Sequence, residues 1–287
     1  MQKKPIIEQH FHGAFGVDFN KASSDDVLFV AQEIYKYGIK GIFPTLVTDS
    51  IENTKKAISS IKEAASKQTD NQAKILGIHL EGIFLNPEKK GIHNDKYFLK
   101  PTVDNYKLIE DDFIKIVTLA PEKADYELIE YLNKRGVKVQ AGHCTGSDLR
   151  GCSGVTHLFN AMSGLHHRNK STALSALIDD DIYTEVIADG IHISDDMLKL
   201  LFKVKPINKI ILISDCLPCT KSDVKEFEFA GEKIYYDGKR ATSIDGTLAG
   251  STMLLTDIIK RLKDLNLVSE DNINVLIDNV YRYHGIE

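Results

Sequence analysis

The sequence has 287 residues, of which 43% are hydrophobic and 27% charged, a composition typical of globular proteins with one or two domains. Its formal net charge of −5 argues against nucleic acid as a partner, because binding to a phosphate backbone needs a basic surface. No apolar run approaches the length of a membrane span, and the basic start MQKKP lacks the apolar segment of a signal peptide. We therefore expect a cytoplasmic protein without a membrane partner.

Eight apolar runs follow one another along the chain, and each is typical of a strand buried on both faces. They cover residues 5–11, 38–47, 73–82, 113–121, 136–144, 154–162, 182–190 and 209–216. The stretches between several of them have helical patterns. Residues 23–38 begin with Ser23 three positions before Asp26, which predicts a capping box, and Gly38 ends the helix. Residues 50–67 and 121–136 have a similar pattern.

This alternation of strands and helices predicts an α/β fold, a (β/α)8 barrel of the TIM type, which we expect to be a single catalytic domain over residues 1–287. One strand–helix unit has little room for its helix, because only residues 145–153 separate the fifth run from the sixth. Residues 226–251 interrupt the pattern after the eighth run. Their alternation and two Asp-Gly pairs predict a β-hairpin insertion, and residues 251–265 then supply the last barrel helix.

Histidine and acidic side chains collect at or near the ends of six of these runs. Any one of them alone is more often solvated or hydrogen-bonded than a ligand. Because the strands of a barrel all end at one face, however, we expect the whole set to converge there. Imidazole combined with carboxylate suits zinc or ferrous iron better than magnesium or calcium. The set comprises His10, His12, His79, Glu81, His143, His157, Asp189, His192 and Asp215.

At these positions the sequence resembles the N-acetylglucosamine-6-phosphate deacetylase family of the amidohydrolase superfamily. The matching stretches are HFHG, HLEGIFLNPEKKGIHN, VTLAPE, AGHC, THLFNAM, ADGIH, SDC and GTLAGS. They keep the order of the family and cover nearly the whole chain. The resemblance implies metal-dependent hydrolysis of the N-acetyl group of N-acetylglucosamine 6-phosphate, which gives glucosamine 6-phosphate and acetate.

The resemblance also implies roles for individual residues. Glu81, His143 and His157 match the main metal ligands, and His10 and His12 match a pair that helps Glu81 hold a second ion, so one or two zinc or iron ions are expected. Asp215 matches the catalytic acid–base, and His192 matches the residue that contacts the scissile carbonyl.

The resemblance also implies a substrate site, which includes more residues than the metal ligands and catalytic groups. Asn160 and Ala161 match a phosphate-binding pair, and Arg168 matches an arginine that reaches the phosphate in a neighbouring subunit, so we expect a homodimer. We also assign Asp189, in ADGIH, to the substrate site. The remaining residues that match the walls of the site are Ile92, His93, Leu248, Ala249 and Gly250.

Some features depart from the family. The chain starts at its first predicted strand, so we expect it to lack the small β-sandwich that family members build from both termini. Cys144 and Cys216 each follow a site residue, and we expect them to pack as small hydrophobic side chains. Four cysteines among 287 residues do not form a disulfide framework, and we expect them to be reduced in the cytosol. Cys216 and Cys219 form a C-x-x-C pair, but the spacing of the other two does not fit a zinc ribbon.

Three other functions remain open at this point. The same metal site would serve another amidohydrolase that acts on a different amide, or a barrel phosphoesterase. A degenerate barrel that only binds a sugar is the alternative without activity, and Asp215 argues against it, because a pure binding protein has no need of an acid–base there.

Overall fold

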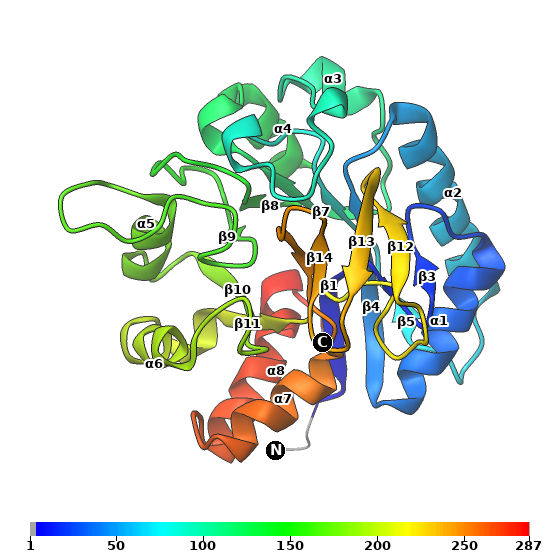
Figure 1. Cartoon of the computed structure of the whole chain (residues 1–287). Coiled ribbons are helices and arrows are strands. Elements are labelled where there is room, and N and C mark those ends of the chain that lie inside the picture. The colour runs from blue at the N-terminus through cyan, green and yellow to red at the C-terminus, as the bar shows by residue number, and fades with distance from the viewer. Residues whose placement is uncertain (1–3, 287) are drawn as a thin grey trace.

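Eight parallel strands form a nearly closed barrel in the computed structural model, which describes residues 4–286 (Figure 1). Each of the eight predicted runs contains one of these strands, which confirms the predicted barrel. Backbone hydrogen bonds from Asp215 to His10 and from His12 to Cys216, both 2.9 Å, join the last strand end to the first. The strands are β1 (Ile6–Phe11), β4 (Ile39–Val47), β6 (Ile78–Glu81), β7 (Ile114–Leu119), β8 (Lys138–Ala141), β9 (Gly154–Val155), β10 (Tyr183–Ile187) and β11 (Ile210–Ile213).

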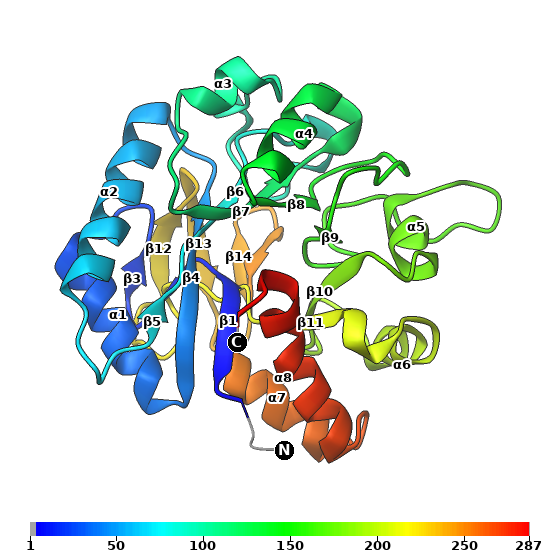
Figure 2. The ribbon, with the colours of Figure 1, turned by 180° about the vertical axis from the view of Figure 1, so that it is seen from behind.

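Helices surround this barrel, as the two opposite views show (Figures 1 and 2). The predicted capping box is present: the Ser23 side chain accepts a hydrogen bond from the Asp26 N–H, and Asp26 accepts one from the Ser23 N–H. The unit between β8 and β9 has no helix, in line with its short sequence. The outer helices are α1 (Ser24–Lys36), α2 (Ile51–Lys67), α3 (Val103–Lys107), α4 (Tyr126–Lys134), α5 (Thr172–Ile178), α6 (Asp195–Val204) and α7 (Leu255–Asp264).

Short elements complete the connections. A two-stranded ribbon follows β1, and a two-residue strand pairs with β4 before β6 begins. Four 3-10 turns occur in the loops, two of them in the connection between β6 and α3. These elements are β2 (Gly13–Ala14), β3 (Val17–Asp18), β5 (Lys74–Ile75), η1 (Pro87–Lys89), η2 (Asp95–Tyr97), η3 (Pro121–Lys123) and η4 (Ile207–Lys209).

The insertion after β11 is larger than predicted. Instead of one hairpin, it forms a four-stranded antiparallel sheet of β12 (Glu226–Phe229), β13 (Glu232–Tyr236), β14 (Ala241–Ser243) and β15 (Leu248–Gly250). Each of the two Asp-Gly pairs lies in a separate turn, and a third turn at Ala230 and Gly231 joins β12 to β13, so the chain reverses three times where a hairpin reverses once. This sheet covers its own small apolar cluster and lies on the near side of the barrel in Figure 1.

The opposite end of the barrel is covered by the last helix, α8 (Glu270–His284), which lies on the near side in Figure 2. The Asn279 side-chain amide donates to the carbonyls of Ile207 and Ile210 at 2.7 and 2.6 Å, and the Tyr281 hydroxyl donates to the Pro5 carbonyl at 2.8 Å. These acceptors lie at or just before the starts of β1 and β11. The helix therefore closes the N-terminal end of the barrel.

The cysteines are unpaired and buried, as expected. Cys144 and Cys216 have no exposed surface and pack as small side chains within the main core. Within residues 4–286, no helix is long and apolar enough to cross a membrane.

Candidate active site

Glu81 stands at the centre of the site, at the end of β6. Its Oε1 lies 2.9 Å from His157 Nε2 and 3.3 Å from His143 Nε2. The two imidazole nitrogens are themselves only 3.1 Å apart. Three ligand atoms that converge in this way on one small volume match the spacing of ligands around a divalent ion.

The second oxygen of Glu81 faces a second pair of imidazoles. Oε2 lies 3.1 Å from His12 Nε2 and 3.6 Å from His10 Nε2. Both histidines face the barrel interior because they are two residues apart where β1 ends, and strand side chains alternate between the two faces. His10 Nε2 is buried and makes no hydrogen bond within the described part of the chain.

These two groups of ligands fit a divalent metal. No hydrogen bond within residues 4–286 satisfies the buried Nε2 of His10, and the combination of imidazole with a carboxylate suits zinc or iron. With Glu81 common to both groups, the residues can hold one or two ions.

Asp215 lies on the same side, just beyond β11. Its Oδ1 is 3.2 Å from His12 Nε2 and 3.4 Å from His10 Nε2. Burial acts to raise the pKa of Asp215, but the interactions with His10 and His12 outweigh burial and hold that pKa below its ordinary value. The side chain is therefore a carboxylate at neutral pH.

His192 is held by Asp189. Its Nδ1 lies 2.8 Å from Asp189 Oδ2, and the other oxygen of Asp189 accepts the N–H groups of Ile191 and His192. Burial opposes the charged imidazole, but Asp189 outweighs it and raises the pKa of His192. The assignment of Asp189 to the substrate site is therefore revised, because its carboxylate supports His192 and does not line the cavity.

A cavity of about 340 Å³ opens above these groups. Most of the residues that were predicted for the site line it: His12, Glu81, Ile92, His93, His143, His157, Asn160, Ala161, His192, Asp215, Leu248, Ala249 and Gly250. His10 lies beneath the cavity floor. Arg168 lies outside, in an exposed loop, so this chain does not bring it to its own cavity.

The structure adds residues that the sequence reasoning missed. The Lys89 carbonyl accepts a hydrogen bond from His143 Nδ1 at 2.8 Å, and Lys89 is one of the residues that line the cavity. Its place in the stretch EKKGIH, between Glu81 and His93, was the available signal. Glu185 lies under His10, and a charged residue inside the apolar strand YTEVI was a signal that we did not use.

No known family model matches the sequence, whereas individual relatives do. The chain is 32% identical, over 98% of its own length and 74% of the relative's, to the N-acetylglucosamine-6-phosphate deacetylase of Bacillus subtilis strain 168. The chain belongs to the N-acetylglucosamine-6-phosphate deacetylase family. The crystal structure of the Thermotoga maritima enzyme of this family superposes with a TM-score of 0.90 at 28% identity, covering 98% of this chain and 78% of that one.

A further relative has a different sugar in its name. The N-acetylgalactosamine-6-phosphate deacetylase of Escherichia coli O157:H7 is 28% identical over 92% of this chain and 72% of its own length. Deacetylases of two epimeric phosphosugars are thus similar to this chain.

Proposed function

We propose that this chain is a metal-dependent deacetylase that hydrolyses N-acetylglucosamine 6-phosphate to glucosamine 6-phosphate and acetate. The observation that carries the proposal is the arrangement around Glu81, whose two oxygens face two pairs of imidazoles while Asp215 stands beside them. A binding protein would have no use for a buried carboxylate in that place. We further propose that residues 1–287 act as one catalytic barrel.

His10, His12, Glu81, His143 and His157 would hold zinc or ferrous iron, in one or two positions. The metal supplies a Lewis acid that polarises the amide carbonyl and makes water a better nucleophile. Asp215 accepts the proton of the attacking water and later passes it to the amine that leaves. His192, oriented by Asp189, donates a hydrogen bond to the oxygen on which negative charge develops.

The phosphate of the substrate needs local donors, because the net charge of −5 does not favour an anion. Asn160 and Ala161 line the cavity and are proposed to bind it. Arg168 is proposed to reach the phosphate in the partner subunit of a homodimer. A cytoplasmic location is part of the proposal, and the four buried thiols agree with a reducing compartment.

Acetate release from N-acetylglucosamine 6-phosphate tests the function, with metal content measured on the same sample. The C4 epimer and unphosphorylated N-acetylglucosamine serve as comparison substrates. Faster turnover of the phosphorylated glucosamine derivative supports the proposal. Preference for the epimer would move the function to the galactosamine branch of relatives, and no acetate from any metal-loaded sample would leave a binding role.

A further inference from the structure

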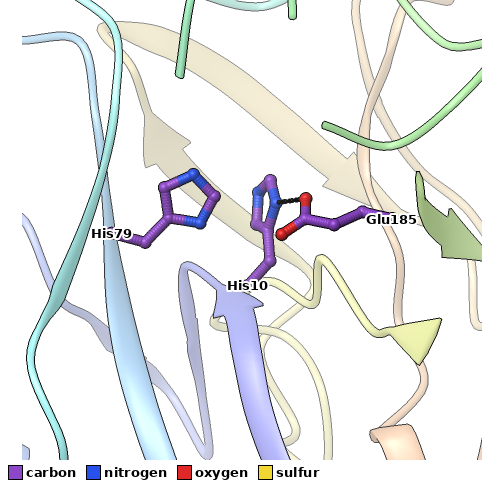
Figure 3. Close-up of side chains that lie close together, drawn as sticks. All are labelled: His10, His79 and Glu185. Atoms are coloured by element: carbon purple, nitrogen blue, oxygen red, sulfur yellow. Dashed lines mark hydrogen bonds and ion pairs between the residues drawn. The ribbon is translucent and has the colours of Figure 1, made fainter. Parts of the chain in front are cut away.

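Glu185 is a buried carboxylate directly beneath the metal site. It projects from β10 into the barrel, and its Oε2 lies 3.0 Å from Nδ1 of His10. Figure 3 shows His10 between Glu185 on one side and His79 on the other. Glu185 is only 1% exposed, and His10 and His79 have no exposed surface, so water does not compete for these contacts.

The contact with Glu185 fixes which nitrogen of His10 faces the cavity. A carboxylate only accepts hydrogen bonds, so Nδ1 of His10 carries a proton that it donates to Glu185, and Nε2 is the ring nitrogen that remains to face the cavity. That Nε2 points toward Glu81 Oε2 at 3.6 Å and Asp215 Oδ1 at 3.4 Å. An imidazole binds a metal through a nitrogen that carries no proton, so with Nδ1 held by Glu185, Nε2 is the nitrogen through which His10 can act as a ligand.

Glu185 is itself held from other elements. Its Oε1 accepts hydrogen bonds from the side-chain amides of Gln9 at 2.6 Å and Gln140 at 3.2 Å. Gln9 also contacts His284, and Gln140 contacts Tyr283, each through its side chain. Residues of β1, β8 and α8 thus fix the carboxylate, directly or through one further side chain.

His79 completes this group but does not make it a separate ion site. Its Nδ1 lies 3.1 Å from the Gln9 carbonyl, to which it donates, and its Nε2 accepts from the Thr118 hydroxyl at 2.7 Å. Both ring nitrogens are therefore used, although His10, His79 and Glu185 are close enough to surround an ion. The ring of His79 meets that of His10 edge-on, with centroids 4.5 Å apart, and limits its rotation.

We propose that Glu185 is a positioning residue that sets the metal affinity of the subsite formed by Glu81, His10 and His12. The other subsite, formed by Glu81, His143 and His157, has its own support from the Lys89 carbonyl and does not depend on Glu185. The inference rests on the proposed function for the identity of the two subsites. It concerns metal binding, which is measurable without substrate.

The test is a zinc titration of metal-stripped protein against a chelator of known affinity, for the wild type and for Glu185→Gln. The substitution keeps the size of the side chain and removes its charge. We expect the second zinc to bind about ten- to a hundred-fold more weakly and the first to bind unchanged, since residues that support a ligand typically have effects of this size. Unchanged binding of the first zinc also reports that the variant is folded.

Thr184→Val is the matched control. Thr184 is fully buried and precedes Glu185 on β10, so its side chain points to the opposite face of the strand, where its hydroxyl donates to the Lys209 carbonyl at 3.3 Å. We expect this variant to bind both zinc ions like the wild type. Equal weakening of both ions in Glu185→Gln, or no weakening at all, overturns the proposal. The same loss in Thr184→Val, or a wild type that binds a single zinc, also overturns it. Acetate release by the wild type, assayed separately, decides the proposed function whatever the titrations give.

Discussion

Glu81 is the residue that the two groups of imidazoles share. His143 and His157 approach its Oε1, and His10 and His12 approach its Oε2. Because only Glu81 belongs to both groups, a change at one pair of histidines removes ligands from one ion position and leaves the other position complete. A variant can therefore lose one of the two ions and still bind the other.

The double variant His10→Asn/His12→Asn tests this separation. An amide is a much weaker zinc ligand than imidazole, so we expect the metal content of zinc-reconstituted protein to fall by about one ion per chain. Elemental analysis of the wild type and the variant measures it. His166 and His167 are exposed, and the same double change there should alter nothing. Equal metal content in all three proteins would leave His10 and His12 without a role in metal binding.

Asp215→Asn separates proton transfer from metal binding. Asparagine keeps the shape of the side chain but cannot accept the proton of the attacking water. We expect the turnover number to fall by roughly 10²- to 10⁴-fold, the usual contribution of an acid–base group, with the metal content retained. Steady-state kinetics and elemental analysis on one preparation measure both. Normal turnover in this variant would remove Asp215 from the mechanism.

At the residue scale, the sequence predicted which side chains converge, and it was less informative about which residues support them. His12, Glu81, His143, His157 and Asp215 were identified because each lies at the end of a buried strand or shortly after it. Asp189 was placed with the substrate because a carboxylate near a strand end can serve either purpose. Only the structure shows both of its oxygens in use by His192 and Ile191.

The ends of three strands have an unusual backbone that no sequence pattern announced. His143, His157 and Asp215 have φ angles of 47°, 31° and 53°, in the left-handed region that non-glycine residues rarely adopt. A left-handed residue turns the chain sharply, which here aims each side chain into the cavity. Such conformations cost about 1–3 kcal/mol each and persist at functional sites. No Gly or Asn marks these three positions, so propensity rules had no basis for predicting them.

Helix α8 gives an element-scale prediction through His284. Its ring stacks on Phe43 with centroids 4.4 Å apart, and its Nε2 donates to Gln9 Oε1 at 3.0 Å. Burial, assisted by the charge of Lys138, lowers the pKa of His284 from 6.5 to about 3. Between pH 6.5 and about pH 3 the unfolded chain binds a proton at His284 that the folded protein does not bind. The contribution of the buried, neutral His284 to the free energy of unfolding is therefore fully present above pH 6.5 and is lost as the pH falls.

The measurement compares the free energy of unfolding of the wild type and of His284→Gln at pH 7.5 and pH 5. We expect the wild type to lose about 2 kcal/mol more than the variant between these values, because 1.5 pH units below the unfolded pKa correspond to roughly that amount. His167→Gln, at an exposed position, should follow the wild type. Parallel pH profiles for the wild type and His284→Gln would contradict the assignment.

The elements themselves were predictable to different degrees. Buried parallel strands are apolar throughout, which is why all eight runs could be identified even where β9 is only two residues long. The insertion was underestimated because alternation and turn residues mark reversals of the chain but do not reveal how far the pairing continues. The position of α8 depends on long-range contacts such as that of Asn279 with the loop before β11, and an amphipathic pattern does not specify them.

For the whole molecule, closure of the barrel brings together residues that are distant in the sequence. Hydrogen bonds between the ends of β1 and β11 place Asp215 beside His10 and His12. This closure leaves Arg168 outside the cavity, in the exposed loop before α5. Arg168 belongs to a larger assembly if the predicted homodimer forms.

Arg168→Ala tests that prediction. A guanidinium donates two parallel hydrogen bonds to phosphate, and the loss of such a charge-assisted interaction costs roughly 1.5–3 kcal/mol. Since each ~1.4 kcal/mol is tenfold in affinity, we expect the KM for N-acetylglucosamine 6-phosphate to rise about ten- to a hundred-fold. Activity on unphosphorylated N-acetylglucosamine should barely change. An equal loss on both substrates would make Arg168 structural, and no loss would assign the phosphate to other groups, among which Lys89 lines the cavity.

A mixed dimer determines which subunit Arg168 serves. Arg168→Ala and Asp215→Asn chains with different tags are coexpressed, and the heterodimer is purified on both tags. Its only site with an intact Asp215 lies in the chain that lacks Arg168. If Arg168 acts across the interface, the Asp215→Asn chain supplies the missing guanidinium, and this site should have the KM of the wild type. If Arg168 acts within its own chain, the heterodimer should keep the raised KM of the Arg168→Ala protein. If no heterodimer forms and the wild type releases acetate as a monomer, the chain is active without the predicted interface.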